Sequence, residues 1–259
     1  MSARPIGVFD SGVGGLTVLR ALRVALPAES LLYLGDTARL PYGTKSEHTV
    51  VRYALQAAEE LIERQVKCLV VACNTASAAA LPALRQRHPE LPIIGVVEPG
   101  ARAACVASVT GRIAVLGTES TVRSGAYTQA ISRIRPAAVV SAIACALFVA
   151  LAEAAAARYL APLRQAGIDT LVLGCTHFPV LAPIIAQAIG TAVRIVDSAA
   201  STAAVVHAEL AERALLRAAG GAPPRITYLA TDGSARFAAV VGRFLGTPIA
   251  VSEVELIDL

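Results

Sequence analysis

Short apolar runs alternate with longer amphipathic stretches along nearly all of this 259-residue chain. The apolar runs predict strands, and the stretches between them, such as 46–64 and 198–217, predict helices. Alternation of this kind produces a parallel sheet with helices on both faces, so the fold class is α/β. The predicted strands are Ile6–Phe9, Leu31–Leu34, Cys68–Val71, Ile93–Val96, Ile113–Leu116, Ala138–Ala142, Thr170–Leu173, Arg194–Val196 and Arg225–Leu229.

An internal repeat divides the chain into two similar parts. Residues 69–75 read Leu-Val-Val-Ala-Cys-Asn-Thr, and residues 171–177 read Leu-Val-Leu-Gly-Cys-Thr-His. A fainter match joins Ile-Gly-Val-Phe-Asp-Ser at 6–11 to Ile-Ala-Val-Leu-Gly-Thr at 113–118, at nearly the same offset. Buried strands that enter helices resemble one another in their apolar residues, but that resemblance does not account for paired cysteines. We therefore predict two pseudo-symmetric lobes, each a parallel sheet flanked by helices.

The lobe boundary is expected near Glu98-Pro99-Gly100, after the fourth strand. The predicted division gives residues 1–97 and 209–259 to a discontinuous first lobe and 98–208 to the second. The strand and helix at 225–245 exceed a simple repeat, so the helix at 198–217 is expected to return the chain to the first lobe. Ligands of such sheets bind at the carboxyl ends of the strands, and the motifs described below all fall at that edge.

Composition excludes several classes of protein. Hydrophobic residues make up 55% and charged residues 16%, which excludes disorder. The net charge is +4, but the basic residues are scattered along the chain and form no cluster, so nucleic acid is not an expected partner. Five cysteines without CxxC spacing predict neither disulfides nor zinc. The first residues show no secretory signal pattern, and we expect a cytoplasmic protein.

The uncharged stretch 137–152 is the one segment that suggests a membrane. Its sixteen residues fall short of the roughly 20 that a spanning helix needs. We interpret it as a buried strand followed by a loop and a helix, with a membrane span as the alternative, and no membrane partner is expected.

The two repeated cysteines, Cys73 and Cys175, are the main candidates for chemistry. Each directly follows a strand and precedes a predicted helix, where free N–H groups and the helix dipole favour a thiolate. One such thiol could act as a base and the other as an acid. The remaining cysteines lack this context and are expected to act as small hydrophobic residues; they are Cys68, Cys105 and Cys145.

A glycine-rich turn at 9–17 matches neither the dinucleotide nor the Walker pattern. Asp10 in this turn would repel a phosphate and suits an ammonium group better, with Ser11 offering a hydroxyl. A capping Asp-Ser pair in a tight turn is the alternative. The turn-rich loop 35–43 is placed to close over a ligand, with Tyr42 and Gly43 supplying hydrogen bonds.

His177 follows Cys175 by two residues and could assist proton transfer. A cysteine–histidine nucleophile of the protease type is a competing interpretation, but it leaves the second cysteine without a role.

Six segments in order resemble the glutamate racemase family of the aspartate/glutamate racemase superfamily. The resemblance extends from Ile6 to about Ser198. Its segments are Gly7–Thr17, Tyr33–Gly43, Val71–Ser77, Gly95–Gly100, Arg123–Tyr127 and Gly174–Pro179.

The resemblance implies two α/β lobes with glutamate buried between them, and no metal, pyridoxal phosphate or flavin. It implies a catalytic set of Cys73, Cys175, His177, Asp10 and Glu153, with Cys73 acting on D-glutamate and Cys175 on L-glutamate. The implied substrate-binding residues are Asp10, Ser11, Pro41, Tyr42, Gly43, Asn74, Thr75, Thr118, Thr121, Thr176 and His177.

One segment departs from the family pattern. Within residues 145–154, Ala146 and Ala150 replace two prolines of the family pattern. Ala154 replaces a second carboxylate. Glu153 is the remaining carboxylate and matches the residue that supports the catalytic histidine. The departures concern the rigidity of this loop rather than the reaction.

The expected activity is racemisation of glutamate without a cofactor, by two cysteines on opposite faces of the substrate. Its product, D-glutamate, would supply peptidoglycan synthesis. The alternatives are an aspartate or other amino-acid racemase of the superfamily and a two-lobed amino-acid binding protein. The sequence leaves a homodimer open.

Overall fold

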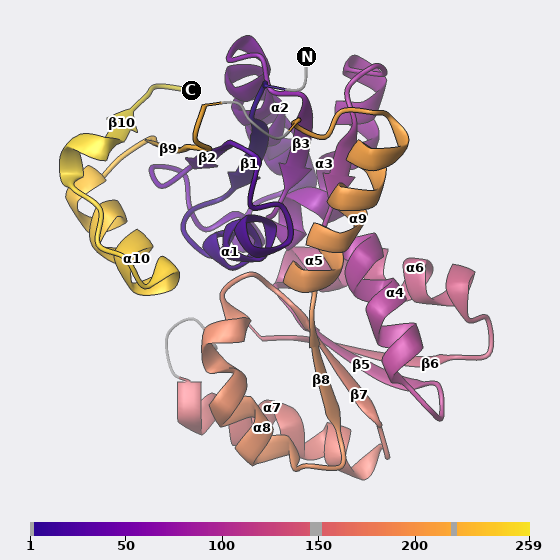
Figure 1. Ribbon diagram of the computed structural model, residues 1–259. Coiled ribbons are helices and arrows are strands. Elements are labelled where there is room, and N and C mark those ends of the chain that lie inside the picture. The colour runs from indigo at the N-terminus through magenta and orange to yellow at the C-terminus, as the bar shows by residue number, and fades with distance from the viewer. Residues whose placement is uncertain (1–2, 146–151, 219–221) are drawn as a thin grey trace.

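The computed structural model describes residues 3–145, 152–218 and 222–259, without the side chains of 152–158. Ala146 and Ala150 therefore lie outside the described residues, as does the side chain of Glu153. Two separate parallel sheets form the framework, one in the upper and one in the lower part of Figure 1. They confirm the predicted α/β architecture of two lobes.

The first lobe is built on a six-stranded sheet of order β10-β9-β2-β1-β3-β4. Its strands are β1 (Ile6–Asp10), β2 (Leu31–Gly35), β3 (Cys68–Val71), β4 (Ile93–Gly95), β9 (Ile226–Ala230) and β10 (Val254–Leu256). Its helices are α1 (Leu16–Ala25), α2 (Glu47–Glu63), α3 (Asn74–Arg87) and α10 (Ser234–Leu245), with short 3-10 helices η1 (Tyr42–Thr44) and η4 (Val251–Glu253).

The second lobe is built on a four-stranded sheet of order β6-β5-β7-β8. Its strands are β5 (Arg112–Gly117), β6 (Val139–Ala144), β7 (Thr170–Gly174) and β8 (Arg194–Asp197). The helices around it are α4 (Val97–Ala107), α5 (Glu119–Arg123), α6 (Ala126–Ile134), α7 (Ala152–Gln165) and α8 (Ala182–Ile189), with the 3-10 helix η3 (Phe178–Leu181).

The repeat in the sequence corresponds to a repeat in strand pairing. Ile6 of β1 pairs with Cys68 of β3, and Ile113 of β5 pairs with Thr170 of β7. Ile6 and Ile113 are equivalent positions of the repeated segments, and so are Cys68 and Thr170. The strand that carries the cysteine is therefore paired with the equivalent strand, in the same register, in each lobe. The order β2-β1-β3-β4 is thus repeated as β6-β5-β7-β8.

Two hydrophobic cores cover the two faces of each sheet. Along β3, Cys68 and Val70 belong to one core, while Leu69, Val71 and the following Cys73 belong to the other. This alternation is the period of two expected for a strand buried on both faces. Cys175 continues β7 in the same way. Cys68 and Cys73 therefore lie on opposite faces of the sheet, Cys68 inside one core and Cys73 just beyond the end of the strand.

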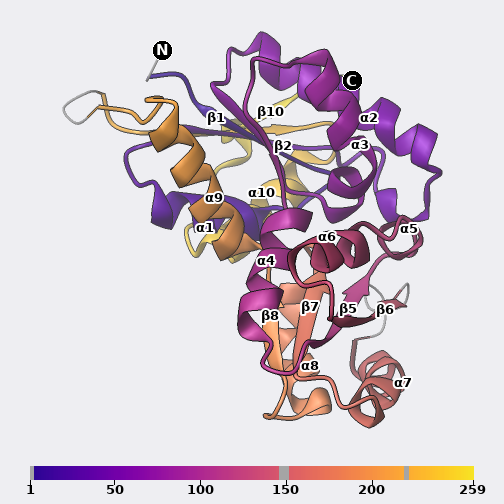
Figure 2. The same cartoon turned by 90° about the vertical axis from the view of Figure 1, so that its right-hand side faces the viewer.

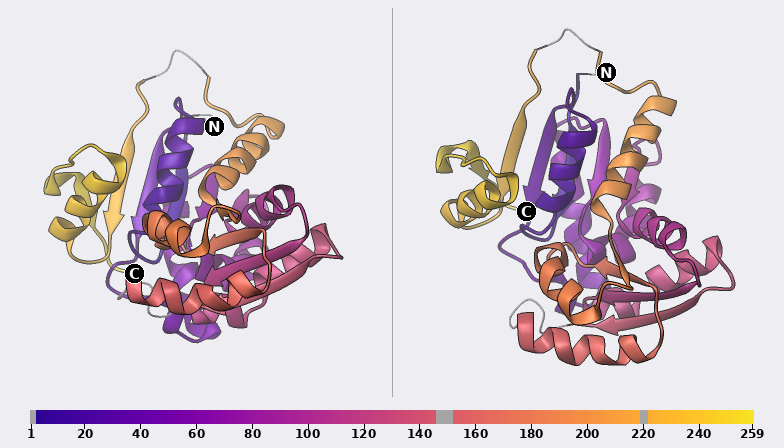
Figure 3. Two further views of the ribbon diagram at one scale, coloured as in Figure 1. Left: turned by 90° about the horizontal axis from the view of Figure 1, so that it is seen from below. Right: turned by 60° about the horizontal axis from the view of Figure 1, so that its bottom comes forward.

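Helix α9 (Ala199–Glu212) leads the chain from the second sheet back to the first lobe. It lies against α1 in Figure 2, and its buried residues share a core with β1 and β3. Both chain ends lie in the first lobe, and α10 lies at its outer edge beside β9 (Figure 3). The residue numbers at which the lobes divide stay a prediction.

Two predictions about single elements were wrong. The stretch from Ala138 was expected to be a buried strand, but among the described residues β6 lies at the edge of its sheet and pairs with β5 alone, and Val139 is 56% exposed. Strand β10 was missed because its three residues, Val254–Leu256, have a glutamate between the two apolar residues and form no apolar run. No helix in the described part of the chain is both long enough and apolar enough to cross a membrane.

Candidate active site

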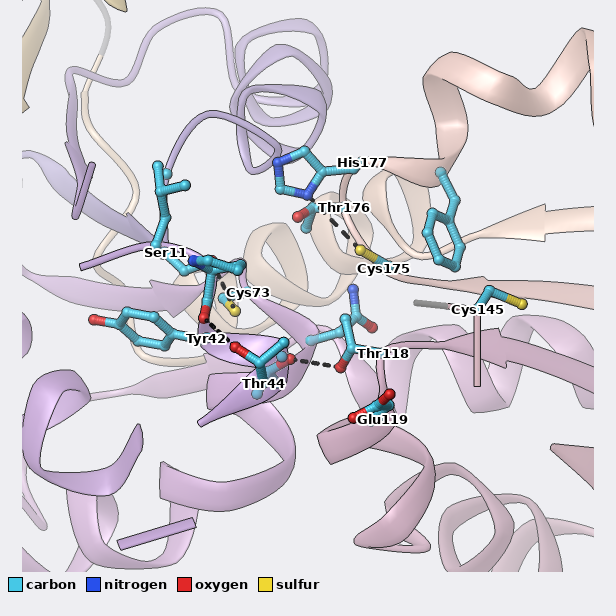
Figure 4. A pocket seen from close by; sticks show the side chains of 17 residues that line it. Ser11, Tyr42, Thr44, Cys73, Thr118, Glu119, Cys145, Cys175, Thr176 and His177 are labelled. Atoms are coloured by element: carbon cyan, nitrogen blue, oxygen red, sulfur yellow. Dashed lines mark hydrogen bonds between the residues drawn. The ribbon is translucent and has the colours of Figure 1, made fainter. Parts of the chain in front are cut away.

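One pocket lies between the lobes, where the carboxyl ends of β1 and β3 face those of β5 and β7 (Figure 4). Its volume is about 170 Å³, below the roughly 300–1,000 Å³ of sites for drug-sized ligands, so it suits a small molecule. The predicted residues that line it are Ser11, Pro41, Tyr42, Gly43, Cys73, Asn74, Thr75, Thr118, Cys175, Thr176 and His177.

Cys73 lies at the junction of β3 and α3 and caps the helix. Its Sγ accepts a hydrogen bond from the N–H of Ala76 at 3.5 Å. The thiol also donates to Oγ of Ser11, 3.4 Å away on the loop after β1. The strand thus carries the sulfur to the pocket, and the helix N-terminus and Ser11 hold it there.

Cys175 occupies the corresponding place after β7 in the second lobe. Its Sγ lies 3.8 Å from Nδ1 of His177. A helix was predicted to follow; a four-residue 3-10 helix, η3, comes first, and α8 begins at Ala182. The two sulfur atoms reach the pocket from opposite lobes, as Figure 4 shows.

Neither thiol is ionised by its position alone. Burial raises the pKa of Cys73 to about 11 and that of Cys175 to about 12. Asp10 raises both further through its negative charge, and N–H hydrogen bonds oppose the shift without cancelling it. The N–H groups after each strand do favour the thiolate, but the predicted net lowering of the two pKa values was wrong because burial outweighs them. The sequence shows the helix start but not the depth of burial.

Acidity also fails to distinguish this pair from the other cysteines. Burial raises the pKa of Cys68 and that of Cys145 to about 12 as well. Cys145 was expected to be only a small hydrophobic residue; it lines the pocket edge, yet it is 1% exposed and its sulfur points away from the pocket in Figure 4. Position on facing walls, rather than pKa, is what makes Cys73 and Cys175 a pair.

Asp10 lies behind the pocket wall and is fully buried. Its carboxylate accepts from the N–H of Gly12 at 2.9 Å and from Oγ1 of Thr176, in the other lobe, at 3.3 Å. Burial raises the pKa of this carboxyl, and the nearby His177 opposes the shift. The structure thus shows Asp10 in the capping arrangement of the alternative interpretation, while its contact with Thr176 links the two lobes.

Close packing explains the glycines of the turn after β1. A Cβ on Gly14 would lie 2.4 Å from Oγ1 of Thr176 and 3.0 Å from Cε1 of His177. The backbone of Gly14 has no positive φ, so this glycine is needed for space rather than for conformation.

The change Gly14→Ala is therefore expected to displace Thr176 and His177 beside Cys175. Because misplacing a reacting group by about 1 Å costs on the order of 100-fold, kcat/KM for the racemisation expected from the sequence should fall by about that factor. The matched control is Gly242→Ala in α10, outside the pocket lining, where Cα of Pro248 at 3.3 Å from the new Cβ would have to shift by only a few tenths of an ångström. Equal kcat/KM for the two variants would contradict this reading of Gly14.

The loop after β2 forms one wall of the pocket, and the hydroxyl of its Tyr42 is already engaged within the protein. The hydroxyl of Tyr42 donates to Oδ2 of Asp36 at 2.5 Å and points away from the cavity in Figure 4. The same fully buried carboxylate accepts from Nε of Arg39 and from the hydroxyl of Thr231. A hydrogen bond from Tyr42 or Gly43 to a ligand must therefore come from their backbone, whereas Thr44 on the same wall also offers a hydroxyl.

Three threonine hydroxyls meet where the lobes touch. Oγ1 of Thr75 lies 3.0 Å from that of Thr118 and 3.3 Å from that of Thr121, which are 3.0 Å apart. Thr75 and Thr118 line the pocket, whereas Thr121 lies behind them. Asn74, also in the wall, leaves its Nδ2 buried without a partner among the described residues. The pocket therefore offers neutral hydrogen-bond donors and acceptors.

Sequence reasoning missed six lining residues, three of them inside the segments discussed above, because Gly, Leu and Phe carry no reactive side chain. Gly12 and Leu40 flank predicted positions, and Glu119 directly follows Thr118. The missed residues are Gly12, Leu40, Thr44, Glu119, Cys145 and Phe178. Among the described residues, no three His, Cys, Asp or Glu side chains come together in a way that could hold a metal ion.

Comparison with known proteins agrees with this geometry. A family model described as Asp/Glu/Hydantoin racemase matches residues 6–206. A glutamate racemase of Geobacter metallireducens is 51% identical over 95% of this chain and 94% of its own length.

Solved structures are similar over the whole chain. Glutamate racemase isoform RacE1 of Bacillus anthracis superposes with a TM-score of 0.93 at 37% identity, covering 100% of this chain and 99% of that one. The Francisella tularensis glutamate racemase, solved in complex with D-glutamate, gives 0.91 at 33% identity, with coverage of 100% and 98%.

Two lobes with a cysteine from each on facing pocket walls define a racemase of the aspartate/glutamate type. Within that class, the chain belongs to the glutamate racemase family.

Proposed function

We propose that this chain interconverts L- and D-glutamate with Cys73 and Cys175 as its two acid–base groups. The observation that carries the proposal is the position of the two thiols, which reach one small pocket from opposite lobes. A single base would return its proton to the face from which it came, whereas two groups on opposite sides of Cα invert the centre.

The reaction needs one thiolate and one thiol. The thiolate takes the α-proton and becomes a thiol, and the electron pair of the broken C–H bond passes into the carboxylate to form an enediolate. The opposite thiol then gives its proton to the other face of Cα and becomes the thiolate. Burial raises the pKa of both thiols, so a further positive charge is needed to form the thiolate. The ammonium group of the bound amino acid is expected to supply that charge.

Stabilisation of the enediolate must come from polar groups in the pocket wall. None of the described lining residues is Lys or Arg. The available donors are the hydroxyls of Ser11 and Thr75, the amide of Asn74 and backbone N–H groups, including those at the start of α3. Fixed donors in a site shielded from water stabilise developing charge without reorganisation.

The other predicted residues keep their roles as proposals. His177, 3.8 Å from Cys175, and Asp10 would support proton transfer, and Glu153 would support His177. The proposed substrate-binding set is Asp10, Ser11, Pro41, Tyr42, Gly43, Asn74, Thr75, Thr118, Thr121, Thr176 and His177, of which Asp10 and Thr121 lie behind the lining.

Incubation of the protein with L- or D-glutamate in deuterated water tests this function. Proton NMR should show loss of the α-proton signal, and circular dichroism should show decay of optical activity from either enantiomer. The same experiment with L- and D-aspartate tests the main alternative. Absence of both inversion and deuterium incorporation with glutamate would contradict the proposal.

The biological setting follows from the same proposal. D-glutamate made by this enzyme would supply peptidoglycan synthesis, and we place the reaction in the cytoplasm. The lobe division at residues 97/98 and 208/209 and a homodimer are further proposals. Sedimentation analysis with and without glutamate tests the homodimer directly.

A further inference from the structure

Tyr127 contacts both lobes but plays no part in the mechanism above. It lies on α6 of the second lobe, is 2% exposed, and does not line the pocket. Its hydroxyl donates across the lobe boundary to Oδ1 of Asn74, with 2.7 Å between the oxygen atoms. Asn74 directly follows Cys73 and forms part of the pocket wall.

A directional chain of hydrogen bonds passes through this tyrosine. The hydroxyl of Ser198, between β8 and α9, donates to Oη of Tyr127, which leaves the tyrosine proton for Oδ1 of Asn74. With Oδ1 engaged, the amide presents Nδ2 on its other side. That nitrogen is buried and has no partner among the described residues. Since an unsatisfied buried donor is costly, a group that binds in the pocket is the expected acceptor.

The ring of Tyr127 also packs beside the second cysteine. A Cβ on Gly174, the residue before Cys175, would lie 3.1 Å from Cε2 of the ring. A Cβ on Gly100 would lie 3.0 Å from the tyrosine oxygen. Because Gly100 and Gly174 have no side chains, Tyr127 fits between them. It thus contacts Asn74, next to Cys73, and Gly174, next to Cys175.

We propose that Tyr127 is a positioning residue that orients the Asn74 amide so that Nδ2 donates to a carboxylate oxygen of the bound amino acid. The inference rests on the proposed function, and it assigns Tyr127 a part in the reaction without contact to substrate. Negative charge on that oxygen grows as the enediolate forms, so a fixed donor there acts mainly in the transition state. Without the tyrosine hydroxyl, the amide can turn and present Oδ1 to the carboxylate instead.

The variant Tyr127→Phe removes only the hydroxyl and tests this role. We expect kcat for glutamate to fall by about tenfold, with a smaller change in KM, because the donor acts mainly on the transition state. The decisive comparison is a double-mutant cycle with Asn74→Ala. In the Asn74→Ala background, Tyr127→Phe should cost no further activity. Tyr228→Phe, a buried tyrosine of the first-lobe core, is the matched control and should keep wild-type kcat.

Two results would overturn the inference: wild-type kcat in Tyr127→Phe, or losses from Tyr127→Phe and Asn74→Ala that multiply. If Tyr127→Phe does not fold, Ser198→Ala removes the donor to Tyr127 and should lower kcat severalfold, again only when Asn74 is present. A wild-type protein that does not racemise glutamate would overturn the proposed function instead. The same cycle, measured as affinity for glutamate by calorimetry, then decides the role of Tyr127 separately.

Discussion

Replacement of either pocket cysteine by serine is expected to abolish racemisation while leaving the protein folded. A serine hydroxyl has nearly the size of the thiol but is far less acidic, so it cannot serve as a base near neutral pH. General acid–base catalysis contributes about 10²–10⁴-fold, and kcat should fall by at least that range in Cys73→Ser and in Cys175→Ser. The measurement is the rate of optical inversion from each enantiomer.

Deuterium exchange distinguishes the roles of the two cysteines. With one base left, the α-proton can still be removed from one face but cannot be replaced on the other. Cys175→Ser should therefore exchange the α-proton of D-glutamate without inversion, and Cys73→Ser that of L-glutamate. Exchange from the same enantiomer in both variants would contradict the assignment, and normal racemisation in either would contradict the two-base mechanism.

A third cysteine provides the matched control for this pair. Cys105 lies on α4, outside the pocket lining, and is only partly buried. Cys105→Ser should keep wild-type kcat. Glutamate affinity, measured by calorimetry, addresses the binding-protein alternative. A binding protein would show no turnover in the wild type and unchanged affinity in all three variants.

The fold was predictable because its signal is periodic and repeated. Nine of the strands appear as short apolar runs, and their observed ends differ from the predicted ones by at most two residues. The paired segments around Cys73 and Cys175 reflect strands with the same neighbour and register in two sheets. The burial of β6 was not predictable, because an apolar sequence does not reveal whether a strand lies at the edge of its sheet.

The membership of the site was more predictable than its chemistry. Motif positions identified most lining residues, since parallel strands bring their carboxyl ends to one edge. They did not reveal that the hydroxyl of Tyr42 is engaged by Asp36, or that burial outweighs the helix N-terminus at Cys73. Both depend on which distant residues pack around a group. The contact between Tyr127 and Asn74 depends in the same way on the approach of two lobes.

A buried ion pair in the first lobe is expected to contribute strongly to stability. Nζ of Lys67 lies 2.5 Å from Oε2 of Glu29, and both side chains are 2% exposed. Lys67 also donates to the carbonyl of Leu215, and Glu29 accepts from the N–H of Arg217. The pair thus fastens the segment that follows α9, which returns the chain from the second lobe.

The variant Lys67→Met should lower the free energy of unfolding by about 3–5 kcal/mol, because Glu29 is left buried without its cation. Urea unfolding followed by circular dichroism measures the loss as a lower midpoint. The double variant Lys67→Met with Glu29→Gln should recover part of it, since no uncompensated charge remains. The exposed pair of Arg213 and Glu209 is the control, and Arg213→Met should cost less than about 1 kcal/mol. If Lys67→Met costs no more than Arg213→Met, the pair does not hold this segment, and its other contacts, such as that of Arg217 with Ser30, must do so.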